Sequence, residues 1–238
     1  MEFEKHCRNL ACELDDTEIS YLRHVVANKY TMTSLERLIN TIKACRYVVE
    51  NEIPGDFVEC GVWRGGHGIL AKLMFQRLDP NRSVWMFDTF AGMTAPDELD
   101  VSVKPDVNSH EIFKKSQRET HNEWCYASLE EVKHNCVNSN LKLDQIKFVQ
   151  GDVTETLKLK KNLPGAISIL RLDTDFYDST KMELEVLYPL VEKGGVITID
   201  DYGYWRGSKL AVDQYFSLGN YKPLFNIIDS SGRSAIKL

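Results

Sequence analysis

The order of apolar and polar positions predicts a chain in which helices and strands alternate after a helical N-terminal part. Residues 1–30 are polar with scattered apolar positions, which indicates a weak helical arm. A clearer helix begins at Thr33 or Ser34, where Thr33 and Glu36 have the spacing of a capping box. Apolar residues then recur at helical intervals, and Pro54-Gly55 ends the segment.

After this segment, short apolar runs that end on acidic residues alternate with helical patterns. We expect strands at 56–62, 83–88, 145–150, 166–173 and 196–201, helices at 66–78, 110–138, 179–191 and 207–218, and a C-terminal strand pair near 223–237. Gly194-Gly195 is expected to stop the third of these helices. The pattern predicts an α/β, Rossmann-like fold with a mainly parallel sheet, helices on both faces and an N-terminal helical arm.

Every expected strand before the C-terminal pair carries an acid near its carboxyl end. The acids are Glu59, Asp88, Asp152, Asp173 and the pair Asp200-Asp201. The carboxyl ends of parallel strands meet at one edge of the sheet, where ligands bind in this class of fold. Like charges clustered there repel one another, so a bound cation, or the hydroxyl and amino groups of a ligand, would relieve the repulsion.

The turn after the first strand reads Gly61-Val62-Trp63-Arg64-Gly65-Gly66 and allows the backbone to approach a ligand closely. Its glycines are spaced G-x-x-x-G-G, whereas a pyrophosphate-binding turn has G-x-G-x-x-G. This spacing suits a smaller ligand such as S-adenosylmethionine. Glu59 would face the methionine end, Asp88 would accept the ribose hydroxyls, and Asp152-Val153 would flank the adenine. A merely tight turn is the alternative.

A second group of acids has the character of a metal site. Asp173 and Asp200-Asp201 end two expected strands joined by one helix, which places their carboxylates close together. Three carboxylates suit a hard cation such as Mg²⁺, which would hold a substrate hydroxyl and orient its oxygen. Helix capping or solvation is the alternative. Asp175 is a candidate general base, because an acid crowded by others has a raised pKa, and a solvated loop acid is its alternative.

These residues lie in blocks that resemble the macrocin O-methyltransferase family over about residues 30–216. The blocks are Tyr30-Thr31-Met32-Thr33, residues 54–66, residues 87–93, Gly151-Asp152-Val153, residues 170–177 and residues 199–203. Members of that family use S-adenosylmethionine and a divalent metal to methylate sugar hydroxyls of natural products. The resemblance implies a class I methyltransferase sheet, with residues 1–50 as an N-terminal arm or lid and residues 51–238 as the cofactor-binding domain.

The resemblance also implies roles for individual residues. The expected cofactor contacts are Tyr30, Thr33, Glu59, Gly61, Arg64, Gly65, Asp88, Thr89, Asp152, Val153 and Asp173. Tyr30 and Thr33 would close over the methionine end of the cofactor. Mg²⁺ would be held by Asp173, Asp200 and Asp201, and catalysis would rest on Asp173 and on Asp175 as the base.

Two features depart from the family pattern. His67 stands where small residues are usual, and residues 94–140, which should form much of the acceptor site, contain no recognisable block. Trp124 and Trp205 are candidates for lining a substrate cleft. The acceptor is therefore expected to be a small-molecule or glycan hydroxyl, with a sugar implied by the resemblance and a catechol or other phenol left open.

Composition and charge exclude several other classes. A net charge of −6 argues against a general nucleic-acid binder, and no apolar run reaches the length that spans a bilayer. Six cysteines without metal-site spacing are typical of reduced thiols, and the charged N-terminus lacks the apolar centre of a signal peptide. We expect a cytoplasmic enzyme, and leave a homo-oligomer open.

Two rival functions remain open at this point. Tyr177 and Lys181 have the Y-x-x-x-K spacing of nicotinamide-dependent reductases and sugar epimerases, and Asp88 suits the ribose of such a cofactor. The glycine pattern of that class is missing, however. The second rival binds S-adenosylmethionine without catalysis, against which the intact acids at the strand ends argue.

Overall fold

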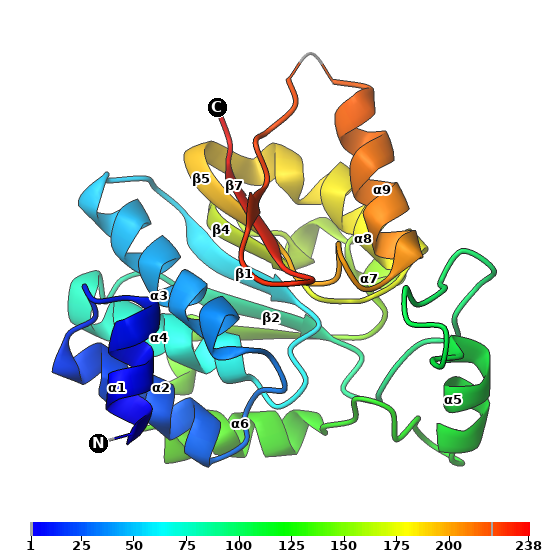
Figure 1. Cartoon of the computed structure of the whole chain (residues 1–238), viewed down its shortest axis with the longest axis horizontal. Coiled ribbons are helices and arrows are strands. Elements are labelled where there is room, and N and C mark those ends of the chain that lie inside the picture. The colour runs from blue at the N-terminus through cyan, green and yellow to red at the C-terminus, as the bar shows by residue number, and fades with distance from the viewer. Residues whose placement is uncertain (1, 220) are drawn as a thin grey trace.

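A seven-stranded sheet forms the centre of the computed structural model, which describes residues 2–219 and 221–238 (Figure 1). The strands are β1 (Asp56–Cys60), β2 (Val84–Asp88), β3 (Ile146–Gln150), β4 (Ile167–Leu172), β5 (Val191–Ile199), β6 (Asn226–Ile227) and β7 (Arg233–Ile236). Their order is β3-β2-β1-β4-β5-β7-β6, with β1 to β5 parallel and the last two antiparallel. The predicted Rossmann-like sheet and the C-terminal strand pair are thereby confirmed. The chain reverses its direction of winding between β1 and β4, the position where such sheets bind ligands.

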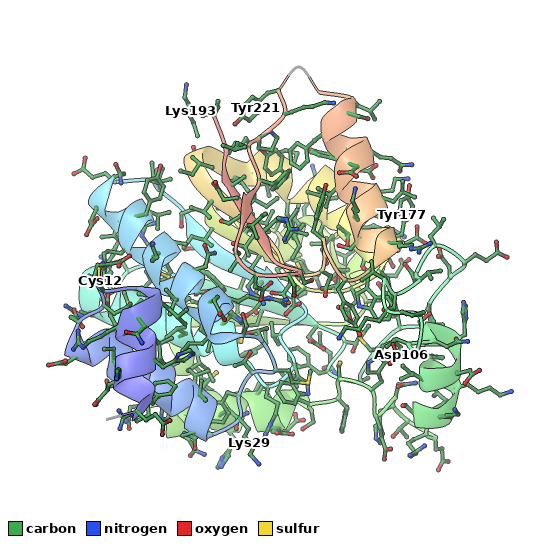
Figure 2. All side chains as sticks on the ribbon, in the orientation of Figure 1. Cys12, Lys29, Asp106, Tyr177, Lys193 and Tyr221 are labelled. Carbon is green, nitrogen blue, oxygen red and sulfur yellow. The ribbon has the colours of Figure 1, made fainter. Side chains whose placement is uncertain are left out.

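Helices cover both faces of the sheet (Figure 1). They are α1 (Glu2–Leu10), α2 (Asp16–Ala27), α3 (Leu35–Glu50), α4 (Gly66–Leu78), α5 (Ser109–Ser116), α6 (Leu129–Asn138), α7 (Val153–Thr156), α8 (Tyr177–Val186) and α9 (Arg206–Ser217). Charged side chains such as those of Lys29 and Lys193 project outward at the rim of the molecule (Figure 2). Among the described residues, none of the helices combines the length and apolar character needed to cross a membrane.

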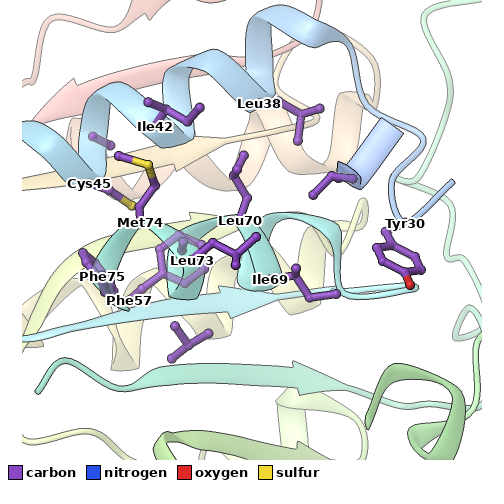
Figure 3. Packing of buried hydrophobic residues seen from close by; sticks show 14 of the residues in the cluster. Tyr30, Leu38, Ile42, Cys45, Phe57, Ile69, Leu70, Leu73, Met74 and Phe75 are labelled. Carbon is purple, nitrogen blue, oxygen red and sulfur yellow. The ribbon is translucent and has the colours of Figure 1, made fainter. Parts of the chain in front are cut away.

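Two hydrophobic cores lie on opposite faces of the sheet, because successive residues of a strand point to opposite sides. In β1, Phe57 contributes to the core under α3 and α4, while Val58 contributes to the core under α8 and α9. In the first core, Leu38 and Ile42 of α3 face the apolar side of α4, which includes Leu70 (Figure 3). The sheet is therefore buried on both faces, as its near-continuous apolar strands predict.

Residues 2–50 contribute side chains to the first core. Cys7, Leu22 and Val25 of α1 and α2 are buried in it together with residues of α4. A capping box formed by Asp15 and Glu18 starts α2. The arm is thus docked on the sheet domain in this structure, and its role as a lid stays a prediction.

Three local predictions were wrong. The cap of α3 is Ser34, whose hydroxyl accepts from the Arg37 N–H, because the Thr33 side chain is engaged elsewhere. The expected helix 110–138 is two helices, α5 and α6, each with its own N-cap, Asn108 and Ser128. The helix expected over 179–191 is α8, which already ends at Val186.

Gly194-Gly195 does not stop that helix either. A short 3-10 turn that contains a proline, Tyr188–Leu190, follows α8, and the two glycines lie inside β5. Gly194 has a φ of +84°, and the register between β4 and β5 shifts there. The glycines therefore form an irregularity of the strand, a role that sequence spacing does not distinguish from a helix end.

Candidate active site

A cavity of about 550 Å³ opens at the carboxyl ends of the parallel strands. Of the expected cofactor contacts, nine line it: Tyr30, Thr33, Glu59, Gly61, Asp88, Thr89, Asp152, Val153 and Asp173. All four acids of the expected metal and base set, Asp173, Asp175, Asp200 and Asp201, line it too. The structure thus brings together residues that lie as far apart in the chain as Tyr30 and Asp201.

Arg64 and Gly65 are the two expected cofactor contacts that do not line the cavity. The Arg64 guanidinium turns outward, donating to Glu131 at 2.6 Å and to the Lys29 carbonyl at 3.0 Å. Gly65 has a φ of +88° and caps α4, with Val132 of α6 beside it. Both residues belong to the turn but lie outside the cavity lining. A side chain of theirs therefore does not contact a ligand in the cavity.

Asp88 at the end of β2 holds the glycine-rich turn in place. One carboxylate oxygen accepts hydrogen bonds from the Val62 and Trp63 N–H groups at 2.8 and 3.1 Å, and the other accepts from the Phe90 N–H at 2.7 Å. Burial raises the pKa of Asp88, although these backbone donors act in the opposite direction. These three donors leave one lone pair, on Oδ1, for a hydroxyl donor in the cavity.

Gly61 shows why the turn needs glycine. It has a φ of +80°, and a Cβ atom there would lie 2.0 Å from the Asp173 carbonyl oxygen. The Asp173 N–H also donates to the Cys60 carbonyl at 2.9 Å. The turn after β1 and the turn after β4 are therefore in direct backbone contact.

Glu59 offers a buried acceptor to a ligand. Its side chain is 2% exposed, and Oε1 lies 3.3 Å from Arg171 Nη1. Oε2 is buried and has no hydrogen-bond partner among the described residues. Burial raises the pKa of Glu59 to about 8, while the Arg171 charge lowers it. Buried polar atoms normally have partners, so this oxygen points to a donor supplied by a bound molecule.

Three carboxylates converge at the ends of β4 and β5. One oxygen each from Asp173, Asp175 and Asp201 lie within 4.8 Å of one another. Burial raises the pKa of Asp175 to about 7 and raises those of Asp173 and Asp201 well above the ordinary value. The charge of Asp200 adds to all three increases, whereas hydrogen bonding with Asp201 lowers the pKa of Asp175. Asp175 has a φ of +70°, an uncommon backbone conformation of the kind found at functional sites. A cation would relieve the repulsion among these acids.

Asp200 lies beside this group, with its carboxylate between two arginines. Oδ1 accepts from Arg171 and Oδ2 from Arg37. Arg171 also donates to Asp173 at 2.6 Å, and Arg37 donates to Asp229 at 2.7 Å. Although burial alone would lower it, the surrounding carboxylates raise the pKa of Arg171, so this arginine is a fixed positive charge under the acids.

The two arginines had been given no role from the sequence. Arg171 could have been singled out from the sequence, because it is a charged residue within the otherwise uncharged strand Ile167–Leu172. A charge in a strand buried on both faces requires partners. Arg37 left no comparable signal, since its partners Asp200 and Asp229 are remote in the chain.

An aromatic group contributes to the lining of the cavity. Trp124, Phe176 and Trp205 have ring centroids 5.6–6.0 Å apart, and the two tryptophans line the cavity. Val107 and Ile112 extend this wall, so the segment 94–140 contributes to the site. The expectation that Trp124 and Trp205 line the cleft agrees with their placement.

The residue pair that suggested a reductase lies elsewhere. The Tyr177 hydroxyl donates to Gln214 at 2.6 Å at the edge of the molecule (Figure 2), and Lys181 is exposed. Neither residue lines the cavity. The Y-x-x-x-K spacing therefore does not bring Tyr177 and Lys181 to the cavity at the carboxyl ends of the strands.

Comparison with known proteins identifies related chains. The family described as macrocin-O-methyltransferase (TylF) matches residues 14–233. The chain is 36% identical over 192 residues to demethyldecarbamoylnovobiocin O-methyltransferase of Streptomyces niveus, a match that covers 79% of this chain and 68% of that protein. It is 31% identical over 178 residues to mycinamicin III 3''-O-methyltransferase of Micromonospora griseorubida, covering 73% and 65%. The chain thus spans about two thirds of the length of these relatives.

Solved structures give the same picture of the fold. The O-methyltransferase NovP superposes with a TM-score of 0.75 at 32% identity, covering 87% of this chain and 82% of that chain. The calicheamicin methyltransferase CalS11 superposes with a TM-score of 0.66 at 18% identity, covering 99% and 91%, and at that identity the likeness concerns the fold alone.

Proposed function

The chain belongs to the macrocin O-methyltransferase family, and we propose that it transfers a methyl group from S-adenosylmethionine to a hydroxyl group of a sugar, with the help of a divalent metal ion. The observation that carries this proposal is the convergence of Asp173, Asp175 and Asp201 in the cavity that also contains Glu59 and Asp88. One cavity thus offers acceptors for a cationic cofactor and carboxylates for a metal.

The cofactor half of the cavity suits S-adenosylmethionine in its donors and acceptors. The unpartnered Glu59 Oε2 is an acceptor for the amino group at the methionine end. Asp88 keeps one lone pair, on Oδ1, for a ribose hydroxyl, and Val153, at the start of α7, offers an apolar surface to the adenine. Asp152 caps α7 through Oδ1, which leaves its second oxygen available to a ligand.

The residues at the ends of β4 and β5 fit a hard divalent cation, because they supply several carboxylate oxygens in one place. Asp173, Asp200 and Asp201 are the proposed ligands of Mg²⁺ or a similar ion, although the carboxylates that the structure brings within 4.8 Å of one another are those of Asp173, Asp175 and Asp201. Asp200 shares its oxygens with the two arginines, and each carboxylate oxygen keeps a further lone pair. The ion, when bound, supplies positive charge that makes a neighbouring hydroxyl more acidic.

Asp175 is the proposed general base. Burial places its pKa at about 7, so near neutral pH it can accept the proton of the acceptor hydroxyl as the oxygen attacks. The new bond joins that oxygen to the methyl carbon, the bond between carbon and the sulfonium sulfur breaks, and the electron pair stays on sulfur as S-adenosylhomocysteine forms. The buried cavity walls hold the two reactants in position and limit access of water.

The aromatic wall supports a sugar as the acceptor. Trp124 and Trp205 present apolar ring surface to the cavity, on which the C–H face of a sugar ring can pack. The names of the relatives from Streptomyces and Micromonospora describe methylation of natural products, in one case at a 3'' hydroxyl. We therefore place a glycoside ahead of a phenol as the acceptor class.

Calorimetric titration with S-adenosylhomocysteine, with Mg²⁺ and with chelator, tests the cofactor and metal assignments. We expect micromolar binding of this ligand and none of NAD. We also expect methyl transfer to a panel of glycosides that stops on chelation and returns with Mg²⁺. Asp173→Asn should abolish transfer, whereas Asp106→Asn, at an exposed acid, should not. Full turnover in chelator would refute the metal requirement, and binding of NAD in place of S-adenosylhomocysteine would refute the function.

A further inference from the structure

His67 connects two parts of the cavity wall through its ring. It is the second residue of α4, directly after the glycine-rich turn, and is 3% exposed. Nε2 lies 2.8 Å from the Thr33 hydroxyl, and Nδ1 lies 2.8 Å from the Thr41 hydroxyl of α3. Both ring nitrogens are therefore used, one toward the segment before α3 and one toward α3 itself.

The hydrogen bonds around His67 fit a neutral ring. Burial lowers its pKa well below the ordinary value, and the positive charges of Arg171 and Arg37 lower it further. A neutral imidazole donates from one nitrogen and accepts at the other. The Thr41 hydroxyl also lies 3.3 Å from the Arg37 carbonyl, to which it can donate. The Thr41 hydroxyl therefore accepts a hydrogen bond from Nδ1–H of His67, and the Thr33 hydroxyl donates one to Nε2.

The chain of hydrogen bonds continues into the segment 30–33. The Thr31 and Thr33 hydroxyls are 2.9 Å apart, and the Thr33 N–H donates to the Thr31 hydroxyl at 3.1 Å. With Thr33 donating to His67, Thr31 donates to Thr33 and each hydroxyl has both a donor and an acceptor partner. The segment is thus organised around the Thr33 side chain, which explains why Ser34 and not Thr33 caps α3.

The segment 30–33 separates the cavity from solvent. All four of its residues line the cavity, while Met32 is 61% exposed on the outside. It packs on the start of α4 so closely that a Cβ atom on Gly66 would lie 2.6 Å from the Tyr30 carbonyl oxygen. Figure 3 shows Tyr30 at the end of this core, beyond Ile69 of α4. Tyr30 also belongs to the first core, so the hydrogen bond between Thr33 and His67 adds to the contacts that hold this segment at the cavity.

We propose that His67 is a positioning residue for the cofactor, which holds the segment 30–33 against the cavity through its hydrogen bond to Thr33. The inference rests on the proposed function, in that the cavity must bind the cofactor. An ordered segment binds a ligand more tightly than one that must be ordered on binding, because the ligand does not have to offset the lost freedom. Loss of the His67–Thr33 hydrogen bond should therefore weaken cofactor binding more than it lowers the stability of the fold.

The test measures the Kd of S-adenosylhomocysteine by calorimetry and the Tm by calorimetric scanning. His67→Ala and Thr33→Val should each weaken binding about tenfold, the effect of one ordinary hydrogen bond. The double variant should be no weaker than the more affected single variant, since both changes remove the same bond. Thr41→Val is the matched control: it removes the other bond to the ring and should lower the Tm while changing the Kd less than threefold.

Two results would overturn the proposal: unchanged affinity in Thr33→Val, or single effects that multiply in the double variant. If His67→Ala does not fold, His67→Phe takes its place in the comparison, because it keeps a ring at this position but has no nitrogen to accept from Thr33. Failure of the wild type to bind S-adenosylhomocysteine at all would instead refute the proposed function, and the two failures are therefore distinguishable.

Discussion

Glu183 of α8 is a buried acid whose effect on stability should depend on pH. Its side chain is fully buried, and Oε1 accepts a hydrogen bond from the Thr174 hydroxyl at 2.8 Å. In the chain, Thr174 stands between the two acids Asp173 and Asp175. Burial raises the pKa of Glu183 to about 8. Glu183→Gln keeps the size of the side chain and the acceptor for Thr174, but it removes the ionisable proton.

The sign of the effect follows from where the proton is held. An unfolded glutamate has a pKa of about 4.3, so between about pH 5 and pH 8 the unfolded chain has lost a proton that the folded chain keeps. The free energy of unfolding of the wild type therefore falls as pH rises through this window, by at most about 1.4 kcal/mol per pH unit. The ceiling is about 5 kcal/mol at pH 8 and above, from a pKa of about 4.3 in the unfolded chain and about 8 in the folded one. Glu183→Gln has no such ionisable group, so its free energy of unfolding does not fall with pH for this reason.

Urea denaturation at pH 5.5, 6.5, 7.5 and 8.5, in the presence of chelator, measures the difference. We expect wild type and Glu183→Gln to be similar at the lowest pH, and the variant to become more stable by a growing margin up to pH 8.5. Glu185→Gln, on the exposed side of the same helix, is the matched control and should show no such trend. A difference between Glu183→Gln and wild type that is constant over the four pH values would refute the reasoning.

Three further predictions concern other parts of the molecule. Asp175→Asn should lower the single-turnover rate of methyl transfer about 10²- to 10⁴-fold with an unchanged Kd for S-adenosylhomocysteine, and the wild-type rate should rise with pH as the Asp175 carboxyl loses its proton. Trp124→Ala should raise the KM for the acceptor about tenfold without changing cofactor affinity, as steady-state kinetics will show. Although burial acts against it, the Arg37 bond lowers the pKa of Asp229, so its stabilisation is present above about pH 4 and lost in acid. Asp229→Asn should therefore destabilise by about 1–3 kcal/mol at pH 7 and by less at pH 3 in urea titrations, because the stabilisation disappears only as pH falls through the low folded-state pKa.

The elements that could be predicted from the sequence are those set by local pattern. Each parallel strand was an apolar run bounded by turn residues, and its acid followed directly, so that Glu59, Asp88 and Asp173 could be placed at one edge without knowing the strand order. Topology rules then required their proximity, since the carboxyl ends of parallel strands share one edge. The prediction that Gly194-Gly195 ends a helix was wrong, because a glycine pair has the same appearance in the sequence at a helix end and in a bulge of a strand.

The remainder depended on contacts between distant residues. Nothing near His67 in the chain shows that Thr33 and Thr41 would bond to both of its nitrogens, because the approach of α3 to α4 is a property of the core. The same holds for the separation of α5 from α6, where Asn122 bonds to the Phe113 carbonyl and organises the intervening loop. Such irregular segments have no periodicity from which a shape could be calculated.

The bond between Arg37 and Asp229 joins residues 192 positions apart and completes the surroundings of Asp200. Contacts of such long sequence separation slow folding, because the entropy of closing the loop is lost before the contact stabilises the chain. During refolding, both cores can be buried before this bond exists. We therefore expect ligand affinity to be the last native property to appear, so that a population of molecules with native helix content would pass through a stage without a finished binding site.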